Sequence, residues 1–168
     1  MGGRLFLDTL GFHENFIART FHVFAAGSGD GLLLMTLKPV ISGVEKAMRS
    51  LDTVSLRLGI KNYGRVKVDP SAPLESIGLV HDTIISTVEG EDYTGLVADL
   101  SGGPRMVVVS ALLALLLASD RVPARLIVQN ETGTGDLLGL GLAPPGSGSP
   151  GDGGPGGGCS GWWPRGQV

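Results

Sequence analysis

A glycine-rich segment in the second half of the chain has the residue types of an anion-binding turn. Ser101, Gly102 and Gly103 separate a short apolar run, 96–98, from a long one, 106–118. An apolar run, a glycine-rich turn and a longer apolar run are typical of a strand followed by a helix. Such a turn directs backbone N–H groups at whatever occupies the strand end. We therefore expect an anion, commonly a phosphate, to bind there.

Charged residues flank these glycines on both sides. Arg105 supplies a fixed positive charge that can fork onto phosphate oxygens. Asp99 could act as a general base, but a carboxylate at a strand end also often caps the following turn. The segment equally fits a turn without a ligand, with Ser101 as a helix N-cap and Pro104 in the first helical turn. The residues alone leave both interpretations open.

Residues 9–14 form a second loop of the same kind. Thr9 can hydrogen-bond an anion or a ribose, and Gly11 permits close backbone approach. His13 is the one histidine placed in such a loop, so we expect it to contact the ligand. A third loop, 39–43, contains Ser42 and Gly43. Because ligands of open α/β sheets bind outside the carboxyl ends of the strands, the three loops are expected to lie together.

Several enzyme classes lack their motifs in this chain. The P-loop pattern is missing, and the Gly-x-Gly sequences at 27–29 and 133–135 lack the strand-to-helix context of a dinucleotide site. The three histidines have no metal-ligand spacing, and no nucleophile, histidine and acid set is visible. We therefore assign no catalytic residue, no metal site and no cofactor.

The elements that must position these loops alternate along the chain. Strands are expected at 4–8, 32–37, 65–68, 95–99 and 125–128, with a weak last strand at 137–142, and helices at 15–24, 42–58, 70–88 and 106–118. This alternation predicts an α/β fold, a Rossmann-like doubly wound, mostly parallel sheet with helices on both faces.

The apolar run 106–118 is shorter than the roughly 18–20 residues of a membrane span, and Arg105 and Asp120 close it on both sides. We expect a helix buried between the sheet and another surface, and no membrane association.

Bulk composition narrows the class of protein. The chain has 168 residues, a net charge of −3 and a single cysteine, Cys159. This balance has no basic footprint of a nucleic-acid binder. One cysteine excludes a disulfide framework, and the N-terminus carries no signal-peptide pattern, so a cytoplasmic location is expected. Glycine and proline dominate the last residues, which predicts one domain over 1–140 and a disordered tail over 141–168.

Two segments together resemble the signature regions of CARF (CRISPR-associated Rossmann fold) domains. They are Thr9-Leu10-Gly11-Phe12-His13-Glu14, which closes the first strand, and Asp99-Leu100-Ser101-Gly102-Gly103-Pro104-Arg105-Met106, which opens the apolar helix. Segments 38–43 and 129–133 add to the resemblance, which covers about 4–140. It is closest to the N-terminal domain of archaeal CRISPR-locus transcriptional regulators.

The resemblance implies a homodimer whose paired loops form one symmetric pocket for a cyclic oligoadenylate, usually the tetra-adenylate. By the match, the pocket is lined by Gly11, Phe12, Ser101, Gly102, Gly103, Arg105 and Met106. The expected ligand-binding set also includes Thr9, Leu10, His13, Ser42, Gly43 and Asp99.

The family regulators carry a winged helix-turn-helix after the sensor domain, and here the Gly/Pro tail stands in its place, so direct DNA binding by this chain is not expected. Two alternatives remain beside a sensor. One is a ring nuclease, which needs only a positioned ribose hydroxyl and groups that stabilise the transition state. The other is an unrelated nucleotide-binding Rossmann enzyme.

Overall fold

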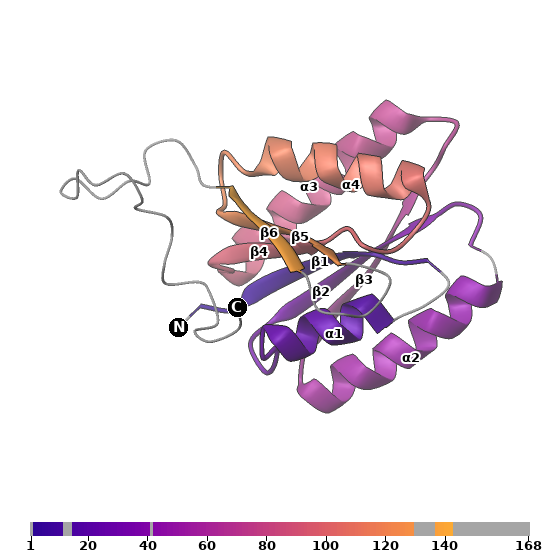
Figure 1. Cartoon of the computed structure of the whole chain (residues 1–168). Helices are drawn as coiled ribbons and strands as arrows, with labels where there is room; N and C mark the ends of the chain where they lie inside the picture. The colour runs from indigo at the N-terminus through magenta and orange to yellow at the C-terminus, as the bar shows by residue number, and fades with distance from the viewer. Residues whose placement is uncertain (1, 12–14, 41, 130–136, 143–168) are drawn as a thin grey trace.

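The computed structural model describes residues 2–11, 15–40, 42–129 and 137–142. Strands and helices alternate along the chain (Figure 1). The elements are β1 (Arg4–Thr9), α1 (Asn15–Val23), β2 (Gly31–Leu37), α2 (Ser42–Leu58), β3 (Lys61–Val68), α3 (Pro73–Glu91), β4 (Gly95–Asp99), α4 (Arg105–Ala118), β5 (Ala124–Gln129) and β6 (Leu137–Leu142).

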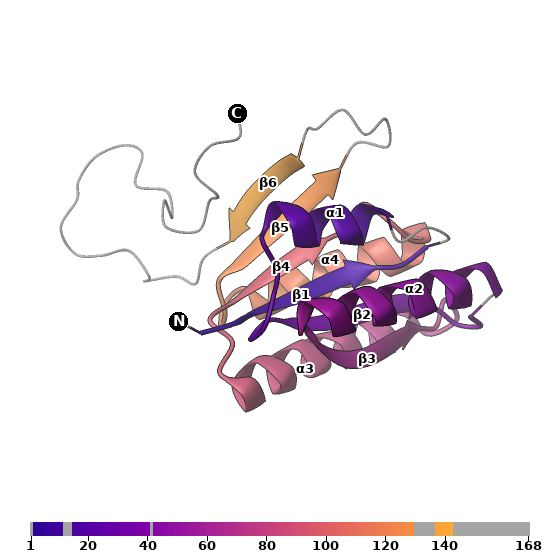
Figure 2. The same ribbon diagram turned by 90° about the horizontal axis from the view of Figure 1, so that it is seen from below.

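The strands form one sheet in the order β3-β2-β1-β4-β5-β6. β1 to β5 pair in parallel, and β6 pairs antiparallel to β5. Helices α3 and α4 cover one face, while α1 and α2 cover the other (Figures 1 and 2). The predicted fold class is confirmed: the sheet is Rossmann-like, doubly wound and mostly parallel. The order reverses between β1 and β4, so the ends of these two strands mark the switch point.

Each face of the sheet packs its own apolar core. Leu5, Leu7, Leu33, Val80 and Leu115 belong to the core under α3 and α4. Phe6, Ile17, Phe21, Leu34 and Leu51 belong to the core under α1 and α2. Residues alternate between the two cores along β1 and β2 because successive strand side chains point to opposite faces.

Helix α4 is covered on one side only within the single chain. Only one of its faces is buried, through Val107, Ala111, Ala114, Leu115 and Ala118. The opposite face is open in the single chain and consists of Met106, Val109, Leu113, Leu116 and Leu117, which are 38–58% exposed. An all-apolar sequence gives no signal of which face a helix buries, because it has no polar side to mark the solvent.

Two smaller differences concern the start of a strand and the predicted domain boundary. β3 begins at Lys61 rather than at 65, with a register irregularity opposite Leu32–Leu34 that its polar sequence concealed. β6 continues to Leu142, two residues past the predicted domain boundary. Within the described ranges, none of the helices combines the length and the apolar character that crossing a membrane requires.

Candidate functional site

The loops that follow β1 and β4 pack against each other through their backbones. Asp8 and Asp99 are register partners at the ends of the two strands. The Thr9 hydroxyl donates to the carbonyl oxygen of Gly102 at 2.6 Å. A Cβ added at Gly102 would lie 2.7 Å from the Thr9 carbonyl oxygen, and one added at Gly11 would lie 2.9 Å from the Gly103 nitrogen. The contact therefore leaves no room for a side chain at Gly102 or Gly11. The two loops lie together in the structure, as predicted.

The turn between β4 and α4 has a backbone conformation that favours glycine. Gly103 has φ +85°, in the left-handed region that side-chain-bearing residues rarely adopt. The helix then begins at Arg105 with Pro104 as its N-cap, and no side chain caps it. The alternative in which Ser101 caps the helix is therefore wrong.

Backbone donors at this turn are left available. The first intrahelical bonds run from Val107 and Val108 to the Pro104 carbonyl oxygen. Within the described part of the chain, the N–H groups of Gly102 and Arg105 have no acceptor. Unpaired N–H groups at a helix N-terminus favour an anion, because the helix dipole adds to their partial positive charge. The exposed Arg105 side chain lies beside them.

Asp99 holds this turn from inside. Its Oδ1 accepts from the backbone N–H of Ser101 at 2.9 Å and from the Ser101 hydroxyl. Its Oδ2 accepts from the hydroxyl of Thr20, on α1, and from Nε2 of Gln129. Asp99 is 1% exposed. Of the two roles open to it from the sequence, the structure shows the capping one, with a carboxylate that organises the turn.

Gln129 and Thr20 are site-supporting residues that sequence reasoning missed. Gln129 ends β5 and donates through Nε2 to the Phe16 carbonyl oxygen at 2.8 Å and to the Thr20 hydroxyl at 2.7 Å. Its backbone N–H donates to the Ser101 hydroxyl at 2.7 Å. These contacts join β5, α1 and the β4–α4 turn. The sequence signals were a polar residue at the end of an apolar strand and the place of Gln129 in the CARF-like segment 129–133. Neither signal indicates its partners, because Phe16 and Thr20 lie more than a hundred residues away in the chain.

Asp8 is a buried carboxyl group without a partner. It is 0% exposed, and neither of its oxygens has a hydrogen-bond partner among the described residues. Burial, with a smaller contribution from the neighbouring Asp99 charge, raises the pKa of Asp8 well above its usual value. Asp8 therefore keeps its proton to a higher pH than an ordinary aspartate does.

The remaining predicted residues divide by location. Leu10 is fully buried and belongs to the core under α1 and α2. Ser42 and Gly43 open α2 after β2, which borders β1, so they lie at the same edge of the sheet. In the described residues no hydrogen bond joins them to the other two loops. Met106 is 38% exposed on α4. Phe12 and His13 lie outside the described residues.

The arrangement suits recognition of an anion by backbone donors and one arginine. Across the described ranges, no group of three or more histidine, cysteine, aspartate or glutamate side chains is placed to hold a metal ion. Among the described residues, the contacts of Asp99 include no histidine and therefore form no catalytic triad.

Fold and strand-end loops together place this protein in the class of Rossmann-like α/β domains. Residues 4–139 match the family model described as the Csa3 CRISPR-associated Rossmann-like domain, so the chain belongs to that family. The resemblance to CARF domains is thereby confirmed.

Two relatives give the scale of the likeness. The "CRISPR locus-related putative DNA-binding protein Csa3" of Saccharolobus solfataricus is 25% identical over 113 residues, which is 67% of this chain and 46% of that protein. The chain thus spans under half the length of this relative. Among solved structures, Enterococcus italicus Csm6 bound to cyclic hexa-2'-fluoro-hexa-dAMP gives a TM-score of 0.54 at 7% identity, covering 78% of this chain and 35% of that one. That likeness shows the fold.

Proposed function

We propose that this protein is a dimeric cytoplasmic sensor that binds a cyclic oligoadenylate, specifically cyclic tetra-adenylate, in the regulation of CRISPR loci. The observation that carries the proposal is the backbone contact between the two glycine-rich loops after β1 and β4. It leaves N–H groups and Arg105 available at one edge of the sheet. Phosphates are the anions that such a turn binds most commonly.

Family membership and the ligand of a structural neighbour support the choice of a cyclic adenylate. The chain belongs to a CRISPR-associated Rossmann-like family. The Csm6 structure of the same fold holds a cyclic hexanucleotide analogue. A ring of repeated nucleotides has rotational symmetry, so two copies of one anion site fit it better than a single copy does.

The open face of α4 supports the dimer. Met106, Val109, Leu113, Leu116 and Leu117 form a continuous apolar stripe along this helix. The stripe begins at Met106, next to Arg105, so a second copy packed on it with the two α4 helices parallel would bring its own anion site close to the first. Large exposed apolar patches usually mark sites where another molecule binds.

Leu113→Glu tests the dimer directly. It places a charge in the middle of the stripe, and we expect the mass from light scattering to fall from two chains to one. Leu56→Glu is the matched control, because Leu56 is 81% exposed on α2, which covers the opposite face of the sheet. A mass that is unchanged by Leu113→Glu would remove the stripe from the proposal.

Binding and cleavage are separated by one experiment with radiolabelled cyclic tetra-adenylate. We expect a gel shift with the ring intact. Arg105→Ala should weaken binding about tenfold or more, because a charge-assisted hydrogen bond to phosphate is lost. Linear products that vanish in Arg105→Ala would instead favour a ring nuclease. A folded dimer that binds no cyclic oligoadenylate would overturn both.

A further inference from the structure

A hollow runs along the outer edge of the sheet, between the edge strand β3 and helix α2. It comprises two neighbouring cavities of about 670 and 320 Å³ that share Arg65 in their linings. We call the two together the edge groove. Its lining includes Met48, Arg49 and Asp52 from α2 and Gly64, Arg65 and Lys67 from β3.

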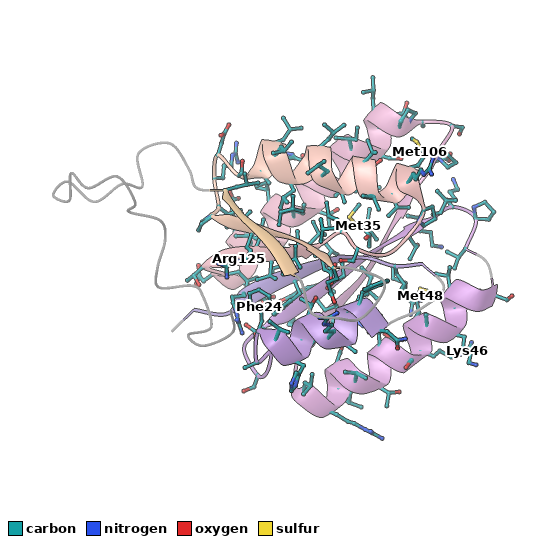
Figure 3. All side chains as sticks on the ribbon, viewed as in Figure 1. Phe24, Met35, Lys46, Met48, Met106 and Arg125 are labelled. Carbon is teal, nitrogen blue, oxygen red and sulfur yellow. The ribbon has the colours of Figure 1, made fainter. Side chains whose placement is uncertain are left out.

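The floor of the edge groove is apolar. Met48 points from α2 toward the sheet, whereas Lys46 points away from it (Figure 3). Ile60 is buried beneath the groove, while Leu56 is 81% exposed beside it. The Ser55 hydroxyl, which also lines the groove, is buried and has no hydrogen-bond partner in the described residues. The apolar surface that an occupant can reach therefore comes mainly from Leu56, because Met48, Ile60 and Ser55 are at most 5% exposed.

The rim of the edge groove is basic, although the net charge of the whole chain is −3. Arg65 pairs with Asp52 at 3.1 Å. Arg49 and Lys67 form no ion pair with any described residue. Both face the same cavity from opposite sides, one from α2 and one from β3. Two unpaired cations that converge on an open hollow favour a negatively charged occupant.

β3 also presents a free strand edge to this groove. It is the first strand of the sheet and, among the described strands, pairs only with β2. Alternate peptide groups of such a strand point outward and can pair with an added chain. The irregularity next to Gly64 confines regular pairing to the stretch 65–68. Basic side chains on this stretch oppose pairing with a second, identical edge, since like charges would meet.

A single-stranded nucleic acid fits the groove less well. Such strands are held by aromatic side chains on which bases stack, and among the described residues no aromatic side chain lines the groove. An extended polypeptide instead supplies backbone groups for β3, apolar side chains for the floor and carboxylates for Arg49 and Lys67.

We propose that the edge groove binds an extended acidic segment of a partner protein, which adds as a short strand beside 65–68 of β3. Its apolar residues contact Leu56 and the half-buried Val40, and its carboxylates pair with Arg49 and Lys67. Main-chain hydrogen bonds supply affinity in this mode, and alternate side chains supply specificity. The inference is separate from the anion site at the ends of β1 and β4.

The test uses the whole chain and a fluorescein-labelled, end-capped peptide with the sequence Glu-Val repeated four times. We expect saturable fluorescence anisotropy at low salt, weakened by added salt. We also expect new protection of the backbone amides within 65–68 from hydrogen exchange. The comparison probes are a Lys-Val peptide of the same length and an eight-nucleotide oligo(dT).

Arg49→Ala and Lys67→Ala should each weaken peptide binding by about fivefold, the scale of one exposed ion pair. Lys46→Ala is the matched control: it removes a cation from α2 that does not line the groove. Protection within 65–68 separates strand addition from loose charge attraction. Equal binding of the Lys-Val peptide, absence of binding by the folded protein, or tighter binding of oligo(dT) with the same variant pattern would overturn the proposal.

Discussion

The proposed anion site and the edge groove belong to one sheet but are built in opposite ways. At the ends of β1 and β4, Asp99, Gln129 and Thr20 are buried and bond to one another, while backbone N–H groups remain free. In the edge groove, Arg49 and Lys67 are exposed and form no ion pair with the described residues. A buried network fixes the geometry of backbone donors, whereas exposed charges act only through what they attract. Changes at the first should therefore alter stability, and changes at the second should alter binding alone.

The largest effect is expected at Asp99. Asp99→Ala removes the acceptor of four hydrogen-bond donors, two of which, on Thr20 and Gln129, are buried, so it should lower the free energy of unfolding by about 3 kcal/mol or more. Urea denaturation measures this. Asp120→Ala is the control, because Asp120 is exposed. Equal stability of the two variants would show that the network does not hold the turn.

The glycine contact gives the next largest effect. Gly102→Ala brings a methyl group within 2.7 Å of the Thr9 carbonyl oxygen, so we expect a loss of about 1–3 kcal/mol together with weaker ligand binding. Gly78→Ala is the matched control: it lies in the exposed part of α3 with nothing within 4 Å of the added Cβ. It should stabilise the protein by about 0.5–1 kcal/mol. Thermal melts of both variants should move in opposite directions, and movement in the same direction would contradict the account.

The pH dependence of stability tests the buried Asp8. Its pKa lies well above the usual 3.8 in the folded protein, so unfolding releases a proton above about pH 4. Stability should therefore fall as the pH rises toward the folded pKa, by at most about 1.4 kcal/mol per pH unit. Asp8→Asn should remove this slope. Superimposable profiles of the variant and the unmodified protein, measured by urea denaturation from pH 4 to 8, would contradict the burial of an acid.

The smallest effect on stability is expected in the edge groove. Arg49→Ala removes an exposed side chain without an ion pair among the described residues, so its free energy of unfolding should change by no more than about 0.5 kcal/mol. The measurement is the same urea titration used for Asp99→Ala. A loss comparable with that of Asp99→Ala would mean that the two regions are not built differently.

Most elements were predicted from the sequence to within a few residues, because their apolar periods differ clearly from the intervening turns. β3 was placed too late because its first half, Lys61–Gly64, is polar and follows no strand alternation. The exposed stripe of α4 was not foreseen, since a uniformly apolar helix does not mark its solvent face.

The sequence predicted the loops of the proposed anion site but not the buried residues that hold those loops in place. Gly11, Gly102 and Gly103 indicate a close backbone approach because they have no side chain. The partners of Asp99 could not be found in this way, because Gln129 and Thr20 reach it only through the order of the strands in the sheet. Asp8 was passed over as the last residue of an apolar strand, and its missing partners are a property of the packed structure.

Isothermal titration with cyclic tetra-adenylate tests the central claim most directly. The account predicts one ring for every two chains, lost or weakened about tenfold or more by Arg105→Ala and unchanged by Arg49→Ala. One ring for each chain, no binding, or loss of binding in Arg49→Ala with retention in Arg105→Ala would contradict it.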